Sequence, residues 1–414
     1  MADIHARALH RLARERGRSE RIADLVAATG LSRRAVQEAL REPPSDPPAD
    51  RGRALDPGTV AEWKRQLPPP DRDLDHVEAT AETAVKRARL LHETYWLDGA
   101  HLICVGDRDL TSLAVAAVSP GVKVSVVDVD EAVLRTIRAI AKRDGLDVET
   151  VFADLRLAPP ASLLESGDLA FTDPPYTPEG VQLFAARALQ MLKPQDAGRV
   201  LIAYGYGEAQ SALGYGVQEA IHELRLLIEA LYPQFNRYAG AEAIGGASSL
   251  YITRPTRRTF AAAEKKGRSS ARIYSAGRSS LESTATLPSL DFGRRKDELT
   301  LDFTGHPDLA LRALLAAPAR HLKVKGAEDL PDLSALYDED GRLQENTLLR
   351  HIADRPNSKL ANAWREAIIA LEPMTKNEAR ARIAAHPETA DLLERRLVEL
   401  PRDALDDLLR ALSA

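Results

Sequence analysis

The segment Leu102-Ile103-Cys104-Val105-Gly106-Asp107-Arg108-Asp109 joins an apolar run to an acidic turn. Four apolar residues that end at a glycine are typical of a buried strand, and a helical pattern follows the turn at 110–118. Three more apolar runs have the same character, at 122–127, 151–153 and 169–172. Further helical patterns occupy 131–144 and the residues after Pro178. This alternation predicts an α/β fold built on a doubly wound, mostly parallel sheet.

Four aspartates are expected at one edge of this sheet. Asp107 lies in the turn after the first strand, and the next three strands end at or beside Asp128, Asp154 and Asp173. Ligands of open Rossmann-type sheets bind at the carboxyl ends of the strands. Asp128 would accept the hydroxyls of a ribose, and Asp154 the exocyclic amine of adenine. The pair favours an adenosine-bearing ligand, although an N-cap is an alternative role for Asp128.

The turn at Gly106 carries a single glycine where a dinucleotide-binding loop would carry several. Asp107 and Asp109 in this turn would repel a pyrophosphate and attract a cation. They therefore disfavour NAD and ATP and favour a nucleoside that bears a sulfonium or an amine. The alternative is structural, with Asp109 or Thr111 capping the following helix.

Asp173-Pro174-Pro175-Tyr176 follows the fourth strand. Two prolines stiffen this turn, so they would hold the Asp173 carboxylate and the Tyr176 ring in one rigid arrangement. A carboxylate and a ring face can orient an amine for attack on carbon and can receive its proton. We therefore expect Asp173 and Tyr176, with Asp154, to be catalytic, and Pro174 to line the nucleoside site.

The whole chain divides into four predicted parts: a helix-turn-helix or winged-helix-like domain at 1–70, the Rossmann-type catalytic domain at 71–260, a basic connector at 261–298 and a mostly helical domain at 299–414. In the last part, helical patterns cover 309–316, 359–371, 376–385 and 390–412. In the first part, Gly30 and Ser32 separate two helices, and Arg33 and Arg34 open the second. These arginines suit DNA recognition, but we favour a packing or dimerisation role.

Composition narrows the classes of function. A net charge of -5 excludes the overall basic field of a dedicated nucleic-acid binder, so nucleic-acid contact is not favoured. The single cysteine, Cys104, excludes an intramolecular disulfide and a cysteine cluster for a metal. We expect a cytoplasmic protein without a membrane segment or a metal, acting as a homodimer on a small amine.

Five stretches resemble one family: Glu82–Val85, Gly106–Ser112, Asp128–Asp130, Thr172–Thr177 and Gly240–Gly245. They are similar to the branched-chain polyamine synthases, also called N4-bis(aminopropyl)spermidine synthases, a class I methyltransferase-like group. Asp173-Pro174-Pro175-Tyr176 also resembles the motif of amino-methyltransferases. The family resemblance implies aminopropyl transfer from decarboxylated S-adenosylmethionine to a polyamine nitrogen, with 5'-methylthioadenosine as by-product. It also implies that Glu242 lies on the acceptor side.

Arg108 departs from that family, whose loop usually reads Gly-Asp-Asp-Asp. Its side chain either points to solvent or pairs with a carboxylate of an amino-acid-like acceptor or of intact S-adenosylmethionine. With intact S-adenosylmethionine as donor, the enzyme would be an N-methyltransferase or a 3-amino-3-carboxypropyltransferase. A third hypothesis is a DNA-binding regulator whose Rossmann-type domain senses a polyamine or a nucleotide.

Overall fold

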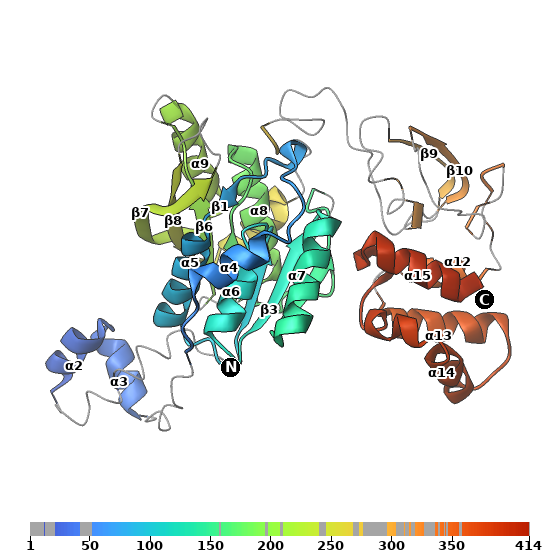
Figure 1. Cartoon of the computed structure of the whole chain (residues 1–414), viewed down its shortest axis with the longest axis horizontal. Coiled ribbons are helices and arrows are strands. Elements are labelled where there is room, and N and C mark those ends of the chain that lie inside the picture. The colour runs from blue at the N-terminus through green and yellow to red at the C-terminus, as the bar shows by residue number, and fades with distance from the viewer. Residues whose placement is uncertain are drawn as a thin grey trace.

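The computed structural model describes residues 12, 21–41, 52–156, 159–194, 198–207, 210–239, 246–267, 273–275, 296–303, 310, 314–315, 319–326, 336–337, 340–342, 344, 347–355 and 358–413. Figure 1 shows an α/β domain at the centre, a helix pair from the N-terminal part of the chain and a set of C-terminal helices. No helix among these residues has the length and apolar character to cross a membrane.

An eight-stranded mixed sheet forms the centre of the α/β domain (Figure 1). Its strands are β1 Glu78–Ala79, β2 His101–Val105, β3 Lys123–Asp128, β4 Val148–Phe152, β5 Leu169–Thr172, β6 Arg199–Tyr204, β7 Leu227–Ala239 and β8 Ala247–Arg254. The order is β1-β7-β8-β6-β5-β2-β3-β4. From β4 to β6 all neighbours are parallel, whereas β8 runs antiparallel to both β6 and β7. The predicted doubly wound, Rossmann-type sheet is confirmed.

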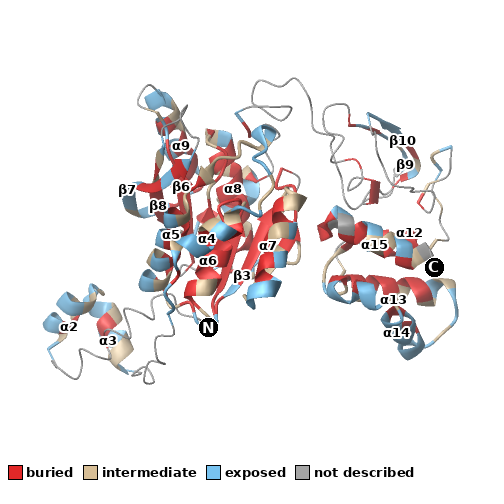
Figure 2. Cartoon of the chain, viewed as in Figure 1, coloured by how far each residue is buried: buried red, intermediate tan, exposed pale blue. Residues whose placement is uncertain are grey.

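Helices cover both faces of the sheet. They are α4 Pro57–Lys64, α5 Ala81–Thr94, α6 Thr111–Val118, α7 Glu131–Asp144, α8 Pro178–Met191, α9 Ser211–Glu223 and α10 Thr259–Lys266, with a short 3-10 helix, η1, at Arg72–Leu74. Apolar side chains of α4 to α7 share one core with the sheet, and those of α8 to α10 share the other. Because both faces are covered, β2, β5 and β6 are buried along their whole length (Figure 2).

The strand register brings the predicted site residues to one edge. Val105, the last residue of β2, pairs with Val127 of β3 on one side and with Thr172 of β5 on the other. Gly106, Asp128 and Asp173 therefore lie at the same carboxyl edge. The helix after β2, α6, and the helix after β5, α8, pack on opposite faces of the sheet. Open α/β sheets bind ligands at such a switch point.

The N-terminal helix pair consists of α2, Ile22–Thr29, and α3, Arg33–Arg41. Gly30 ends α2 in the left-handed conformation, with φ of 70°, a conformation that glycine adopts without strain. Leu12, Leu25 and Val36 form a small core between these elements. The helix-turn-helix domain stays a prediction, because most of residues 1–20 lie outside the described part of the chain.

The C-terminal part contains two parallel strands and several helices. Its elements are β9 Lys296–Asp302, β10 Ala319–Lys325, α12 Leu348–Ala353, α13 Leu360–Leu371, α14 Lys376–Ala384, the 3-10 helices η4 Pro387–Leu392 and η5 Leu397–Glu399, and α15 Arg402–Ser413. The prediction of one helical stretch over 390–412 is wrong. Pro401 lacks an N–H and disfavours a helical residue before it, so α15 begins only at Arg402.

The C-terminal helices contact the free edge of the central sheet. The Arg395 guanidinium donates a hydrogen bond to the carbonyl of Thr150 in the edge strand β4. The Glu399 carboxylate accepts one from the Ser162 backbone N–H at 2.9 Å. An exposed strand edge can pair with other chains. The Arg395 contact therefore occupies one backbone group of this edge.

Candidate active site

A cavity of about 600 Å³ opens at the carboxyl ends of β2, β3 and β5. Nine of the predicted site residues line it: Gly106, Asp107, Arg108, Asp109, Asp128, Asp154, Asp173, Pro174 and Tyr176. Sequence positions that are far apart thus meet at one place. The tenth, Glu242, lies outside the described residues.

Asp107 holds the start of helix α6. Its two carboxylate oxygens accept hydrogen bonds from the backbone N–H groups of Thr111, at 2.8 Å, and Ser112, at 2.9 Å. Burial raises the pKa of Asp107 to about 7, although the hydrogen bonds from Ser112 and Thr111 oppose this rise. The N-cap position of α6 is Leu110, and the Asp107 side chain binds the first N–H groups of this helix in place of a cap side chain. Neither Asp109 nor Thr111 has the capping role considered from the sequence.

Asp128 is not the N-cap of the helix that follows it. That position belongs to Asp130, whose carboxylate accepts from the N–H groups of Ala132 and Val133. Asp128 instead accepts from the backbone N–H of Asp130 at 2.9 Å and from that of Asp107 at 3.1 Å. Each of its oxygens keeps a second lone pair, which leaves acceptor capacity for ribose hydroxyls.

Asp154 forms an ion pair that the sequence did not reveal. The Nε of Arg156 lies 2.9 Å and 3.1 Å from its two oxygens, and Nη2 also donates to it. Both side chains are buried. The Cζ of Arg156 lies 5.9 Å from the centroid of the Tyr274 ring. Asp154 is thus an internally neutralised carboxylate at the cavity wall, and its contact with adenine stays a prediction.

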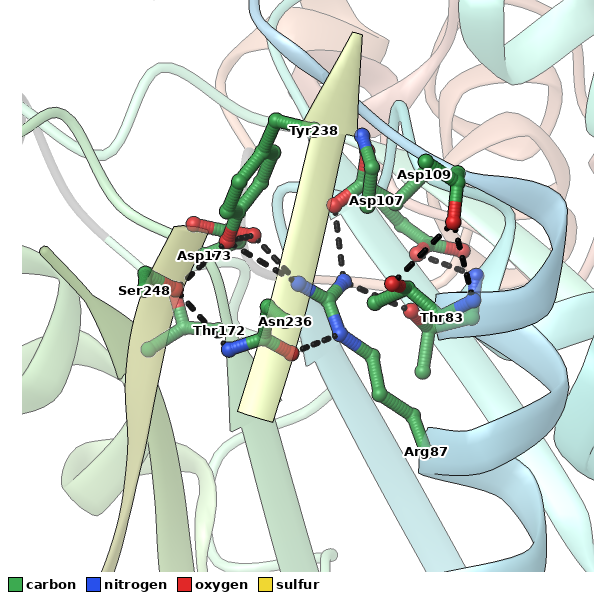
Figure 3. A network of polar contacts seen from close by, with 12 residues as sticks. Thr83, Arg87, Asp107, Asp109, Thr172, Asp173, Asn236, Tyr238 and Ser248 are labelled. Atoms are coloured by element: carbon green, nitrogen blue, oxygen red, sulfur yellow. Dashed lines mark hydrogen bonds and ion pairs between the residues drawn. The ribbon is translucent and has the colours of Figure 1, made fainter. Parts of the chain in front are cut away.

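Arg87 of α5 lies at the centre of a polar network (Figure 3). Its side chain is 0% exposed. The acceptors are Asn236 Oδ1 at 2.8 Å, Asp109 Oδ2 at 2.7 Å, Thr111 Oγ1 at 3.2 Å, Asp173 Oδ2 at 2.6 Å and Tyr238 OH at 3.2 Å. A guanidinium has five N–H groups, so these five acceptors match its full donor capacity.

Sequence reasoning missed Arg87, since arginine on a helix is usually solvent-exposed. A signal was present in its spacing. Ala84 and Leu91 lie three residues before and four residues after it, and both are buried on the same face of α5. An arginine within an apolar stripe indicates a buried ion pair. Its acidic partners are Asp109 and Asp173, which the sequence had already predicted as site residues.

The two carboxylates that share Arg87 titrate differently. Burial raises the pKa of Asp173 to about 7, Arg87 opposes the rise, and Asp109 reinforces it. Burial is the largest influence on Asp109 and acts in the same direction, but the charges of Arg87 and Lys64 and the hydrogen bonds to Asp109 together outweigh it and lower its pKa. Asp109 is therefore the ionised partner of the guanidinium. Asp173 exchanges a proton close to neutral pH.

Tyrosine side chains surround Asp173. The Tyr238 hydroxyl donates to its Oδ2 at 2.6 Å, and the Tyr176 hydroxyl donates to its Oδ1 at 3.1 Å. The ring centroid of Tyr176 lies 5.4 Å from that of Tyr204 and 6.3 Å from that of Tyr238. Ring faces and a carboxylate attract cations. This wall of the cavity can hold a sulfonium or an amine next to a proton acceptor.

Arg108 does not point to solvent, since its side chain is 5% exposed. Its Nη2 donates to the carbonyl of Pro68 at 2.6 Å and to Oε1 of Glu78 at 2.7 Å. The Nε and Nη1 groups are enclosed and have no hydrogen-bond partner among the described residues. The prediction that Arg108 points to solvent is therefore wrong. The alternative prediction, that it pairs with a substrate carboxylate, is not tested by these contacts.

A sequence profile described as the branched-chain polyamine synthase A C-terminal domain matches residues 58–264, which is half of the chain. The chain belongs to the branched-chain polyamine synthase A family. The matched range contains the sheet, the cavity and all of the predicted site residues. The resemblance read from the sequence is confirmed.

Curated relatives of this family member match over the same region. A protein of Methanocaldococcus jannaschii is 35% identical over 195 residues, which cover 47% of this chain and 48% of the relative. The N(4)-bis(aminopropyl)spermidine synthase of Thermus thermophilus is 33% identical over 172 residues, covering 40% and 50%. That of Thermococcus kodakarensis is 31% identical over 182 residues, covering 43% and 51%. The chain spans about half the length of the curated relatives it matches.

Among solved structures, the branched-chain polyamine synthase of Thermus thermophilus is similar to this chain. It was solved in complex with N4-aminopropylspermidine and 5'-methylthioadenosine. The alignment has a TM-score of 0.42 and 21% identity, and it covers 60% of this chain and 86% of that chain.

Proposed function

We propose that this chain transfers an aminopropyl group from decarboxylated S-adenosylmethionine to a nitrogen of an amine acceptor such as a polyamine. The observation that carries the proposal is the position of Asp173. Its carboxylate lines the cavity beside the Tyr176 ring, and its pKa of about 7 makes it a proton acceptor at neutral pH. Membership of the branched-chain polyamine synthase A family supports the same reaction.

The reaction requires one bond to form and one to break. The nitrogen lone pair of the acceptor attacks the aminopropyl carbon that is bonded to the sulfonium. The carbon–sulfur bond breaks, and its electron pair stays on sulfur, which leaves 5'-methylthioadenosine as a neutral thioether. The acceptor nitrogen gives up one proton, which the Asp173 carboxylate receives. Holding both substrates in line contributes much of the rate, as in other group transfers.

The cavity offers separate positions for the two substrates. Asp128 retains free lone pairs for the ribose hydroxyls of the donor, and the turn from Gly106 to Asp109 borders the sulfonium side. Asp173 and Tyr176 hold the acceptor amine by hydrogen bonding and by the attraction of the ring for a cation. Asp154 and Glu242 remain proposed adenine and acceptor contacts.

By-product analysis tests the reaction. Purified protein is incubated with spermidine and either donor, and the nucleosides are identified by mass spectrometry. We expect 5'-methylthioadenosine from the decarboxylated donor, and its loss by at least about 100-fold in Asp173→Asn, in line with the removal of a general base. S-adenosylhomocysteine from intact S-adenosylmethionine would replace the proposal by N-methyl transfer. Absence of both nucleosides would contradict it outright.

A further inference from the structure

The guanidinium of Arg108 is only partly satisfied. It lies on the wall of the cavity with its side chain 5% exposed, and Nη2 alone has partners, the Pro68 carbonyl and the Glu78 carboxylate. The N–H of Nε and both N–H groups of Nη1 have none among the described residues. Burying a donor without a partner costs free energy. A guanidinium left in this state at a substrate cavity indicates an acceptor group that arrives with a substrate.

Arg87, which lines the same cavity, allows a comparison of the hydrogen-bond partners of two buried guanidinium groups. Both arginines are buried and both line the same cavity, but Arg87 has an acceptor for each of its five N–H groups. Its charge is compensated by Asp109 and Asp173. Arg108 has one carboxylate partner, Glu78, whose own side chain is 29% exposed. The fold therefore supplies hydrogen-bond acceptors for all N–H groups of Arg87 but, among the described residues, for those of Nη2 alone in Arg108.

The remaining acids of the cavity are engaged elsewhere. Asp154 is paired with Arg156, Asp107 accepts the first N–H groups of α6, and Asp128 accepts two backbone N–H groups. Asp75, which also lines the cavity, accepts from the backbone N–H and the hydroxyl of Ser275. Among the described residues, these contacts leave no acid for the three N–H groups of Arg108, which points to an anion that arrives with a substrate. A guanidinium donates strong, charge-assisted hydrogen bonds to a carboxylate, and Nη1 of Arg108 has two N–H groups for such a contact.

We propose that Arg108 binds a carboxylate group of a substrate where the loop from Gly106 to Asp109 lines the cavity. The guanidinium keeps its Nη2 contacts, and the N–H groups of Nη1 donate hydrogen bonds to the carboxylate of the ligand. This inference rests on the proposed group transfer and refines its substrates. The carboxylate belongs either to an amino-acid-like acceptor or to the donor. In the second case the donor is intact S-adenosylmethionine, and the transferred group is 3-amino-3-carboxypropyl in place of the aminopropyl group proposed above.

Matched ligands that differ by one carboxylate distinguish the two sources. Calorimetric titration of the full chain compares S-adenosylmethionine with its decarboxylated form, and ornithine with putrescine in the presence of 5'-methylthioadenosine. Arg108→Gln removes the charge and keeps a donor for the Pro68 carbonyl. Arg89→Gln, on the exposed side of α5, is the matched control. Affinity for 5'-methylthioadenosine, which has no carboxylate, shows that each variant is folded.

We expect one carboxylate-bearing member to bind at least about 10-fold more tightly than its partner, since a charge-assisted hydrogen bond has this size. The preference should vanish in Arg108→Gln and persist in Arg89→Gln. Preference within the donor pair assigns the carboxylate to the donor, and preference within the amine pair assigns it to the acceptor.

Two other results overturn the inference in distinguishable ways. If wild-type protein binds 5'-methylthioadenosine but prefers neither carboxylate, or keeps its preference in Arg108→Gln, the role of Arg108 is refuted and the group transfer stands. If wild-type protein binds none of the nucleosides, the proposed function is refuted, and the inference is refuted with it.

Discussion

Arg87 shows how a single side chain can organise a site without being visible in a motif. It joins α5 to the acidic turn, to the end of β5 and to β7 through five hydrogen bonds. Burial opposes its charge, but Asp109 and Asp173 outweigh burial and raise its pKa above the ordinary value. Such a pair need not stabilise the fold more than apolar packing would. Breaking it, however, leaves a buried carboxylate without a counter-ion.

Replacement of Arg87 by methionine is expected to lower the free energy of unfolding by about 3–5 kcal/mol, because Asp109 would remain buried and ionised without its partner. Urea denaturation at pH 7 measures this loss. Arg89→Met is the matched control, since Arg89 lies on the same helix and is exposed. Equal losses in the two variants would contradict the role of Arg87 in the network.

The titration of Asp173 predicts the pH dependence of activity. Its pKa is raised to about 7, chiefly by burial, so the carboxyl group is protonated below that pH and ionised above it. Only the ionised form can accept a proton from the amine. We therefore expect the rate of 5'-methylthioadenosine release to rise as the pH increases from 6 to 8. A rate profile of wild-type protein that is flat over this interval would argue against Asp173 as the proton acceptor.

Helix starts hold the cavity loops in place. The Asp107 side chain binds the first N–H groups of α6, and Asp130 caps α7 by accepting from the N–H groups of Ala132 and Val133 at 2.9 Å and 3.1 Å. Both carboxylates follow directly on the strands that end at the cavity. The turns are therefore fixed at their strand side by the sheet and at their helix side by a carboxylate.

Asp130→Ala is expected to lower the free energy of unfolding by about 1 kcal/mol, because two backbone N–H groups of α7 lose their acceptor. Thermal or urea denaturation of the variant gives the value. Asp130→Asn keeps a side-chain oxygen in the same position and should retain most of the stability. A loss in Asp130→Asn as large as that in Asp130→Ala would show that the charge, rather than the cap oxygen, is what stabilises this helix.

At the scale of the whole molecule, the described residues contain separate hydrophobic cores. Two flank the central sheet, and a third is formed by the C-terminal helices around Trp364, which is 2% exposed. The polar contacts of Arg395 and Glu399 connect this third core to the sheet domain. We expect the two parts to unfold as distinct units, because few contacts cross between them.

Trp364→Ala should destabilise the C-terminal helices by about 3–5 kcal/mol, since it leaves a large void in their core. Calorimetry is expected to show one transition moving to lower temperature while the other stays in place. Binding of 5'-methylthioadenosine to the sheet domain should be unchanged at temperatures below both transitions. A joint shift of all transitions would mean that the molecule unfolds as one unit.

Strands β6, β7 and β8 were not predicted from the sequence. The alternation of four strands and three helices between residues 102 and 191, the edge at which the acids gather and the proline-braced turn at Asp173 were predicted. These features depend on neighbouring residues: apolar runs, strand ends and prolines act locally. The predicted helix over 390–412 is interrupted for a local reason too, since Pro401 lacks an N–H and α15 begins after it.

The tertiary structure alone decided which partners the charged groups have. Arg87 reaches Asp109 across 22 positions and Tyr238 across 151, and Arg108 reaches Glu78 across 30. The pKa of Asp173 and the partial pairing of the Arg108 guanidinium both follow from such contacts. Burial and pairing are properties of the packed molecule, because they depend on residues that only folding brings within hydrogen-bond distance.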